Sequence, residues 1–282
     1  MPEGHTIHRL ARDHRRLLGG QVVAASSPQG RFAEGAARID GRVLQGTEAY
    51  GKHLFHRYAG GGLLHVHLGL IGSFLAGIGS PPTPRGALRL RLVGDGCWLD
   101  LRGAMVCELI TPPERNALLS RLGPDPLRRG ADPYRAWARI SRSQLPIGRL
   151  LMDQVVVAGI GNVYRAELLY RHRVDPFLPG RQLRQESWLL IWSDLLALMR
   201  AGVRTGRIVT TRPEDRPGRR LTTELAYYVY RRAGQACRVC GTTIATEVLA
   251  GRNLFWCPQC QAAEPAQAAV RRPPGHTAPG RP

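Results

Sequence analysis

Lysine is almost absent from this chain: Lys52 is the only one among 282 residues, whereas lysine and arginine together number 40. Acidic residues are also few, 21 in all, so the formal net charge is +19. No apolar run reaches the roughly 18 residues of a membrane span, and the N-terminus lacks the apolar segment of a secretion signal. A GC-rich genome that favours arginine codons would explain part of the arginine excess. So large a positive charge nevertheless indicates a polyanion as partner. Because both apolar segments are missing, we expect a cytoplasmic protein with no membrane partner.

Cysteine is used sparingly, and four of the six cysteines form one pattern. Cys237 and Cys240 are separated by two residues, as are Cys257 and Cys260, and sixteen residues lie between the pairs. Two such knuckles on either side of a β-hairpin can present four thiolates to a tetrahedral metal ion. A redox pair or disulfides are the alternative, but these are uncommon in the cytosol. The spacing therefore predicts one structural Zn²⁺.

The chain begins Met1-Pro2-Glu3-Gly4, and an initiator methionine before proline is usually removed. Pro2 would then carry a free secondary amine with a pKa of about 8, so part of it is neutral near pH 7. A neutral amine is a nucleophile, and the neighbouring Glu3 can transfer protons for it. The alternative is that Glu3 only decorates the first turn of a helix. The pattern makes Pro2 and Glu3 candidate catalytic residues.

Most of the first 110 residues are of β type. Apolar residues at helical spacing first predict an amphipathic helix over residues 3–18. Short β-type runs then follow, separated by glycine-rich turns, and Leu88–Leu92 alternates apolar and basic residues as a half-buried strand does. The predicted strands are Gln21–Ala25, Val43–Tyr50, His53–Tyr58, Leu63–Leu68, Leu88–Val93 and Cys97–Leu101. This spacing indicates an antiparallel sandwich or barrel.

Two turns in the β region suggest function. Tyr50–His53 joins two strands and places Lys52, the sole lysine, at the tip of a hairpin. His67–Gly72 follows a strand with an apolar loop, Gly69-Leu70-Ile71, held between glycines. Both can be ordinary hairpins. An exposed apolar loop on so basic a protein, however, is typical of a wedge that enters a base stack.

Helical patterns dominate after a proline- and glycine-rich segment, residues 111–132, which predicts a linker. Asp132-Pro133 supplies an N-cap and a first-turn proline. Predicted helices follow at Tyr134–Ser143, Ile147–Asp153, Tyr164–His172 and Glu186–Met199. The residues after 262 are rich in alanine, proline and arginine and have few large apolar side chains, so we expect them to be disordered.

A glycine-rich turn runs into one of these helices at residues 157–165. Backbone N–H groups at a helix N-terminus attract anions, so the turn predicts a phosphate site, with Asn162 as N-cap or phosphate donor. The turn lacks the full dinucleotide spacing and no β-α-β pattern surrounds it, which excludes a Rossmann site. Arg252 lies where the tip of the hairpin between the cysteine pairs is expected.

These motifs occur in one order that resembles the formamidopyrimidine-DNA glycosylase/endonuclease VIII family, over about residues 2–262. The motifs are the Met-Pro-Glu-Gly start, Gly51-Lys52, the segment from Leu151 to Tyr164, and the four cysteines. The resemblance implies that Pro2 attacks C1′ of a damaged nucleotide and forms an imine. It also implies that Glu3 protonates the opening sugar ring and that Lys52 assists as an acid. Elimination from the imine would then cut the strand on both sides.

The resemblance further assigns residues that bind DNA. Asn162 and Arg252 would hold the phosphates that flank the lesion. Leu70, with Gly69 and Ile71 beside it, would fill the space left by the flipped base. The implied partner is damaged double-stranded DNA, or single-stranded or bubble DNA, bound by a monomer that is associated with the nucleoid.

Two departures from the family pattern bear on the substrate. The family usually has glutamate at the sixth position, where this chain has Thr6. The oxidised-guanine branch usually carries an Asp-Pro-Arg-Arg-Phe-Gly loop, where this chain has Asp100–Ala104. The missing Phe and the Leu70 loop favour the endonuclease VIII branch and oxidised pyrimidines. An oxidised-purine glycosylase and a non-catalytic binder of damaged or abasic DNA are the alternatives.

The expected fold is α+β and has several domains. An N-terminal helix and antiparallel β-sandwich would form residues 1–120, with a helix-two-turn-helix domain over 121–225. A Cys₄ zinc finger would follow over 226–262, and a disordered tail over 263–282. DNA would lie in a basic cleft between the first two domains, with an affinity that falls as salt increases.

Overall fold

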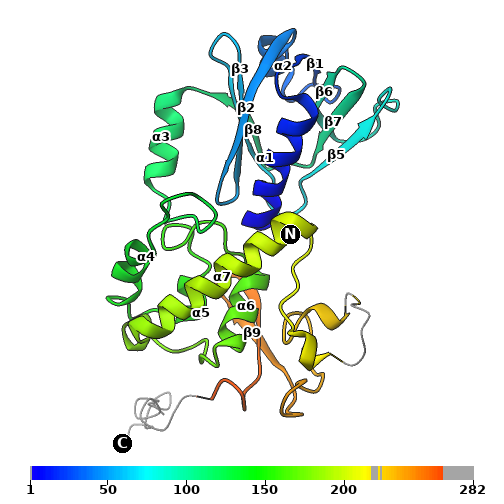
Figure 1. Cartoon of the computed structure of the whole chain (residues 1–282). Helices are drawn as coiled ribbons and strands as arrows, with labels where there is room; N and C mark the ends of the chain where they lie inside the picture. Colours follow the sequence, from blue (N-terminus) through cyan, green and yellow to red (C-terminus); the bar gives the residue numbers. More distant parts are fainter. Residues whose placement is uncertain (1, 217–221, 223, 263–282) are drawn as a thin grey trace, which may run out of the picture.

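The first helix connects the two main parts of the molecule. The computed structural model describes residues 2–216, 222 and 224–262; the tail expected to be disordered lies outside them. Helix α1 (Gly4–Leu18) buries Ile7, Ala11 and Leu18 in the core of the β domain. Its N-terminal end also packs against α7 (Gln185–Thr205) of the helical domain. Figure 1 shows α1 running from the β domain down to α7.

One strand links the two halves of the β domain. All eight strands pair antiparallel in the order β5-β7-β6-β1-β2-β3-β4-β8. The first two residues of β1 pair with β2, whereas its last three pair with β6. A strand that changes partner in this way forms the corner of a sandwich. The bounds are β1 (Val22–Ser26), β2 (Arg42–Tyr50), β3 (His53–Tyr58), β4 (Leu63–His67), β5 (Ser73–Ile78), β6 (Leu88–Gly94), β7 (Cys97–Arg102) and β8 (Val106–Ile110).

The two edge strands, β5 and β8, are absent from the sequence prediction. Leu75 and Ile78 of β5 are exposed, because the strand ends the sheet and little packs on it. An edge strand of this kind has no clean alternation of apolar and polar residues, so the period-of-two pattern is lost. The short helix α2 (Ala33–Ile39) is also absent from the prediction; it buries Ala36 and Ile39.

The predicted linker contains a helix that the sequence did not indicate, α3 (Pro112–Ser120). Thr111 and Glu114 make a reciprocal capping box at its start, and the two prolines occupy the first helical positions. Prolines are tolerated there because those N–H groups have no partner within the helix. No residue of α3 is buried, so the helix joins the two domains along the surface.

The helical domain has its own core around Trp188, Ile191 and Leu195 of α7. The predicted stripe on α7 is therefore core packing, and Gly206 ends the helix with a positive φ of 75°. The remaining helices are α4 (Pro133–Ile140), capped by Asp132 as predicted, α5 (Ile147–Leu150) and α6 (Asn162–Arg171). Short 3₁₀ turns occupy Gly180–Gln182, Pro213–Asp215 and Glu224–Ala226.

A two-stranded hairpin completes the described chain. It consists of β9 (Ala245–Leu249) and β10 (Arg252–Trp256) and lies against α6. Its small core combines Phe255 and three cysteines with Tyr170 of α6. Of the helices in residues 2–262 that the structure describes, none has the length and apolar character needed to span a membrane.

Candidate active site

Three glycines from distant parts of the chain meet where the two domains join. A Cβ atom on Gly4 would lie 2.9 Å from the Cα of Gly159, and one on Gly51 would lie 2.9 Å from the Cβ of Ala158. The N–H of Gly4 donates to the carbonyl of Gly159 at 2.8 Å. Side chains at these positions would force the backbones apart. The glycines therefore bring the chain start, the β2–β3 hairpin and the turn before α6 to one point.

Glu3 occupies the N-terminus of α6. Its carboxylate is fully buried and accepts hydrogen bonds from the N–H groups of Gly161 and Val163, both at 2.8 Å. A Cβ on Gly161 would lie 2.4 Å from the Glu3 Cδ, so glycine is needed at this position as well. The backbone N–H groups that were predicted to bind a phosphate therefore bind the Glu3 carboxylate of the same chain instead. Gly161, not Asn162, is the N-cap residue.

Lys52 lies at the tip of the β2–β3 hairpin, as predicted, and interacts electrostatically with Glu3. Burial raises the pKa of the Glu3 carboxyl; the Lys52 charge and the α6 N–H groups oppose this rise. Burial likewise lowers the pKa of the Lys52 amine, and Arg252 lowers it further, while Glu3 acts in the opposite direction. Both shifts favour the neutral forms, which suits two groups that exchange protons.

Pro2, half-buried, directly precedes Glu3 in the chain and so lies beside this pair. The hairpin tip is fixed relative to α1 by Asp125, a residue that the sequence did not suggest. Its fully buried carboxylate accepts from the N–H of Gly51 at 2.8 Å and pairs with His8 at 2.7 Å. One carboxylate therefore holds together the elements that carry Pro2, Glu3 and Lys52.

Asn162 and Arg252 lie on opposite sides of the contact between α6 and the β9–β10 hairpin. The Asn162 side chain donates to the carbonyl of Asn253 at 2.9 Å. Arg165, fully buried, donates to the carbonyls of Leu249 and Asn253 at 3.1 and 3.2 Å. Arg252 is exposed at the start of β10; burial lowers the pKa of both Lys52 and Arg165, and the Arg252 charge adds to this effect. An exposed cation thus influences the candidate catalytic group Lys52.

The apolar loop between β4 and β5 is exposed, as predicted for a wedge. Leu70 and Ile71 are 48% and 84% exposed, and Gly69 has a positive φ of 69°. Met105, on the turn between β7 and β8, is 67% exposed. It packs beside Gly69: a Cβ added to Gly69 would lie 3.0 Å from the Cβ of Met105. The sequence analysis missed Met105, because only the fold brings its turn next to the Leu70 loop.

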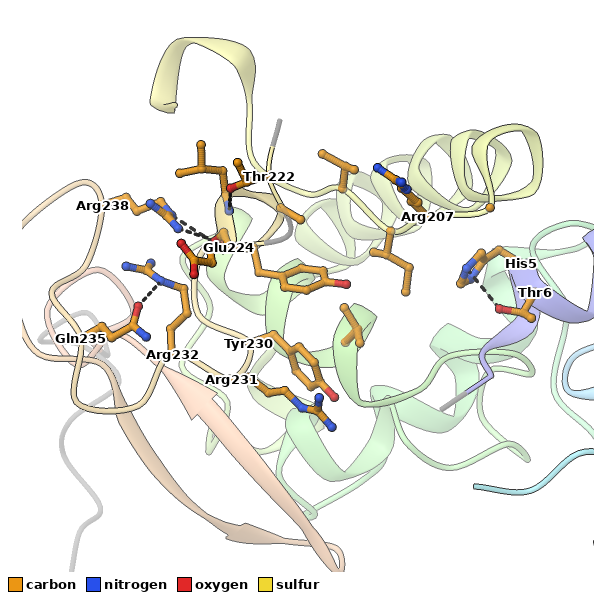
Figure 2. A pocket seen from close by; sticks show the side chains of 17 residues that line it. His5, Thr6, Arg207, Thr222, Glu224, Tyr230, Arg231, Arg232, Gln235 and Arg238 are labelled. Carbon is orange, nitrogen blue, oxygen red and sulfur yellow. Dashed lines mark hydrogen bonds between the residues drawn. The ribbon is translucent and has the colours of Figure 1, made fainter. Parts of the chain in front are cut away.

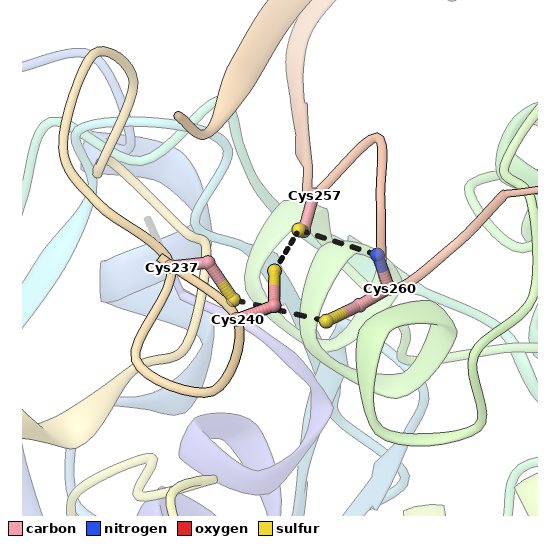
Figure 3. A group of neighbouring side chains, drawn as sticks. All are labelled: Cys237, Cys240, Cys257 and Cys260. Carbon is pink, nitrogen blue, oxygen red and sulfur yellow. Dashed lines mark hydrogen bonds between the residues drawn. The ribbon is translucent and has the colours of Figure 1, made fainter. Parts of the chain in front are cut away.

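The four predicted cysteine ligands come together in one cluster, shown in Figure 3. All four sulfur atoms lie within 4.8 Å of one another, and two of the Sγ–Sγ distances are 3.9 and 3.5 Å. A tetrahedral Zn²⁺ with bonds of about 2.3 Å needs sulfurs about 3.8 Å apart. The donor set and its spacing fit zinc, and the cluster ties the β9–β10 hairpin to the segment that precedes it.

Three protein-family models match this chain in the order of its domains. They are the formamidopyrimidine-DNA glycosylase N-terminal domain over residues 1–104, the formamidopyrimidine-DNA glycosylase H2TH domain over 122–213, and the zinc finger found in FPG and IleRS over 234–263. Endonuclease 8 1 of Mycobacterium tuberculosis is 54% identical over 267 residues, covering 93% of this chain and 100% of that protein. The chain belongs to the formamidopyrimidine-DNA glycosylase/endonuclease VIII family.

Other relatives and the fold agree with this membership. Endonuclease 8 2 of Mycobacterium bovis is 36% identical, covering 93% of this chain and all of that protein. Formamidopyrimidine-DNA glycosylase of Thermus thermophilus is 30% identical, covering 94% of this chain and all of that protein. The Lactococcus lactis Fpg in complex with abasic-site DNA has a TM-score of 0.76 at 22% identity, covering 93% and 100% of the two chains. As a family member, the chain is a bifunctional DNA glycosylase and AP lyase of base-excision repair, and it binds damaged DNA.

Next to the start of the chain lies a cavity of about 860 Å³ (Figure 2). His5 and Thr6 form one side of it, and Tyr230 lies across from them (Figure 2); Arg207, just after the end of α7, and Tyr227 also line it. Thr6 stands where the family usually has glutamate, and its Oγ1 shares a hydrogen bond of 3.3 Å with His5 Nε2. Burial lowers the pKa of His5 to about 4, so the ring is neutral at pH 7. The side of the cavity formed by His5 and Thr6 therefore carries no charge near neutral pH, whereas the rest of the lining includes the charged side chains of Arg207, Glu224, Arg231, Arg232 and Arg238.

Removing one zinc ligand is expected to disable DNA binding through the finger. In Cys257→Ser the site loses a thiolate, and the β9–β10 hairpin that carries Arg252 loses its attachment. We expect loss of the single zinc equivalent and DNA binding weaker by about tenfold or more, because structural zinc supplies folding energy to such modules. Mass spectrometry measures the metal content, and fluorescence anisotropy measures DNA binding.

Cys97→Ser is the matched control. Cys97 lies outside the cluster and donates a hydrogen bond to the carbonyl of Leu17, and a serine hydroxyl can donate the same bond. A zinc-free Cys257→Ser protein that binds DNA normally would contradict the prediction.

Proposed function

We propose that this enzyme removes oxidised pyrimidines from double-stranded DNA through an imine at Pro2 and cuts the strand by β,δ-elimination. The observation that carries the proposal is the position of Glu3. Its carboxylate is wholly buried beside the N-terminus, held by two 2.8 Å hydrogen bonds, and electrostatically coupled to Lys52. In this proposal Pro2 is the nucleophilic amine, Glu3 the proton donor and Lys52 a second amine beside them.

The chemistry follows from these groups. The secondary amine of Pro2 attacks C1′, and Glu3 supplies the proton that lets the sugar ring open as the base leaves. The product is an iminium, which lowers the pKa of the adjacent C2′ and allows the 3′-phosphate to depart. A second elimination releases the 5′ side and leaves a one-nucleotide gap. Lys52, whose pKa is lowered by burial, can both give and take a proton during these steps.

The surroundings suit a flipped nucleotide bound by a single protein molecule. In this proposal Arg252 and Asn162 hold the flanking phosphates, and the cavity beside Thr6 receives the base. Leu70, with Gly69 and Ile71, would fill the space that the base leaves, and Met105 enlarges the same apolar surface. The absence of a Phe in the loop at residues 100–104 supports the pyrimidine preference over oxidised purines.

A lesion panel tests the proposal. Single-turnover reactions would use matched duplexes that contain thymine glycol, 5-hydroxycytosine, 8-oxoguanine or an abasic site. We expect base release from both oxidised pyrimidines at least about tenfold faster than from 8-oxoguanine, a ratio that pocket contacts can supply. Excision of 8-oxoguanine at an equal or greater rate would place the chain in the oxidised-purine branch. Tight binding with no base release and no strand cleavage would instead favour the non-catalytic binder.

A further inference from the structure

A tyrosine of α6 contacts one of the four sulfur atoms of the zinc site. The hydroxyl of Tyr170 lies 3.2 Å from Cys237 Sγ. Tyr170 is buried in the last turn of α6 and lies outside the finger, whereas Cys237 begins the first Cys-x-x-Cys pair. One hydrogen bond therefore joins the helical domain directly to a metal ligand.

The zinc-bound form of the finger determines which of the two atoms donates. A cysteine binds zinc as a thiolate, which carries no hydrogen and can only accept. A tyrosine hydroxyl keeps its proton at neutral pH, because its ordinary pKa is about 10. Tyr170 is therefore the donor and Cys237 the acceptor. Such a bond to a charged atom is stronger than one between neutral groups.

Packing on the ring of Tyr170 directs its hydroxyl to the sulfur. Tyr228 stacks on this ring, with centroids 4.7 Å apart and an angle of 26° between the planes. The hydroxyl of Tyr228 donates to Asp215 and accepts from the N–H of Arg212 at 2.9 Å, so the second ring is fixed as well. Both rings belong to the small core that contains Phe255 and three of the cysteines.

The finger is attached to both ends of α6. At the start of the helix, where the Glu3 carboxylate binds the first N–H groups, Asn162 and Arg165 donate to backbone carbonyls of the β9–β10 hairpin at 2.9 and 3.1 Å. At the other end, Tyr170 donates to Cys237. The first attachment holds the hairpin that carries Arg252, and the second holds the metal site.

We propose that Tyr170 is a positioning residue of the zinc site, whose hydroxyl holds the Cys237 thiolate on the metal and ties the finger to the end of α6. A hydrogen bond draws electron density from the sulfur and fixes its direction, so a competing ligand displaces this thiolate less readily. Outer-shell partners of metal ligands change metal affinity by about 10- to 100-fold. Tyr170 therefore determines how long the finger keeps its zinc, and with it how long the protein binds DNA.

Two neighbouring tyrosines allow a matched comparison. Tyr170→Phe keeps the ring that stacks on Tyr228 and removes only the hydroxyl that donates to Cys237. Tyr228→Phe is the control, because this ring is equally buried and its hydroxyl bonds to Asp215 and Arg212 instead of a cysteine. Incorporation of 3-fluorotyrosine in place of Tyr170 makes the opposite change: fluorine makes the phenol more acidic and a stronger donor, while the size of the ring is nearly unchanged.

The first measurement is the absorption spectrum of the full chain with Co²⁺ in place of zinc. Thiolates bound to Co²⁺ give sulfur-to-metal charge-transfer bands, whose energy rises when the sulfur accepts a hydrogen bond. We expect the bands to move to lower energy in Tyr170→Phe, to higher energy with 3-fluorotyrosine, and to stay in place in Tyr228→Phe. Bands at the wild-type position in both Tyr170 proteins would overturn the proposal. If Tyr170→Phe does not fold, the fluorotyrosine protein decides alone.

The second measurement is the transfer of zinc to the coloured chelator 4-(2-pyridylazo)resorcinol. We expect Tyr170→Phe to lose its zinc about tenfold faster than wild type and Tyr228→Phe, and to lose DNA binding at the rate at which it loses the metal. Before the chelator is added, its Kd for DNA should equal that of wild type. Equal rates of zinc transfer in all three proteins would refute the role of Tyr170. Neither measurement uses base release or strand cleavage, so failure of the proposed function would leave both results valid.

Discussion

Replacing Pro2 with glycine is expected to lower strand cleavage at abasic sites by roughly 10³-fold or more while leaving DNA affinity unchanged. Glycine keeps an N-terminal amine, so the comparison tests what the secondary amine contributes. A secondary amine forms an iminium, whose positive charge cannot be lost by deprotonation. A primary amine forms a neutral imine that must be protonated before it can draw electrons from C2′. Borohydride trapping, followed by mass spectrometry of the linked peptide, measures the adduct directly.

The composition of the chain makes this test unusually sharp. Lys52 is the only lysine, so an aliphatic amine that forms an adduct must be either the N-terminus or Lys52. A chain that keeps an extra residue before Pro2 turns the candidate nucleophile into a peptide amide and should give no adduct. Pro28→Gly, in an exposed turn, is the matched control for loss of a proline. A wild-type rate for Pro2→Gly, with an adduct mapped to Lys52, would overturn the assignment.

Patterns in the sequence predicted those parts of the fold that depend on local chemistry. β3 has the predicted limits His53–Tyr58, because its residues are mostly buried and tight turns bound it on both sides. Asp132 caps α4 through its own side chain, a signal that lies within three residues. The zinc ligands follow from their spacing. β5 and β8 were missed because edge strands lack a buried face on which a period of two would be imposed.

The sequence named Pro2, Glu3 and Lys52 as candidate residues, but it did not indicate how they are arranged in space. The turn before α6 looked like a phosphate site, and nothing local shows that a carboxylate from Glu3, 158 residues earlier in the chain, fills it. Gly51 and Gly161 were predicted as turn residues, whereas the structure uses them, together with Gly4, for close approach of distant parts of the chain. The contacts of Asp125 with Gly51 and of Tyr170 with Cys237 depend on how the domains pack, which periodicity does not encode. The catalytic roles of Pro2, Glu3 and Lys52 and the limits of the domains stay predictions.

Glu3→Gln is expected to separate the two activities of the enzyme. Base release needs a proton at the sugar ring as it opens, so its rate should fall by about 10²- to 10⁴-fold. A preformed abasic site already interconverts with an open aldehyde, which Pro2 can attack without that proton. Cleavage of abasic DNA should therefore fall much less than base release. Single-turnover assays on a thymine glycol duplex and an abasic duplex give both rates, and an equal loss in the two would show that Glu3 acts mainly on a step that they share.

The same substitution has a stability effect whose sign follows from burial. Because the folded pKa of Glu3 lies above its ordinary value of 4.5, the folded protein binds a proton more tightly than the unfolded chain. The stabilising contribution of Glu3 is complete below pH 4.5 and is lost as pH rises through the folded pKa. Glutamine does not titrate, so the stability of Glu3→Gln relative to wild type should increase from pH 4.5 to 8. Chemical denaturation across that range measures the change.

Glu167 provides the matched control for this stability effect. It is also fully buried, its pKa is also raised by burial, and it accepts 2.8 Å hydrogen bonds from the N–H groups of Tyr228, Val229 and Tyr230. Each substitution leaves an amide NH₂ facing a backbone N–H, and so removes a hydrogen bond at a cost of about 1–3 kcal/mol. Glu167→Gln should therefore show the same trend with pH. If only Glu3→Gln showed it, burial would not be the cause; if neither did, both carboxylates would be ionised in the folded protein, and Glu3 would enter the reaction without the proton that base release requires.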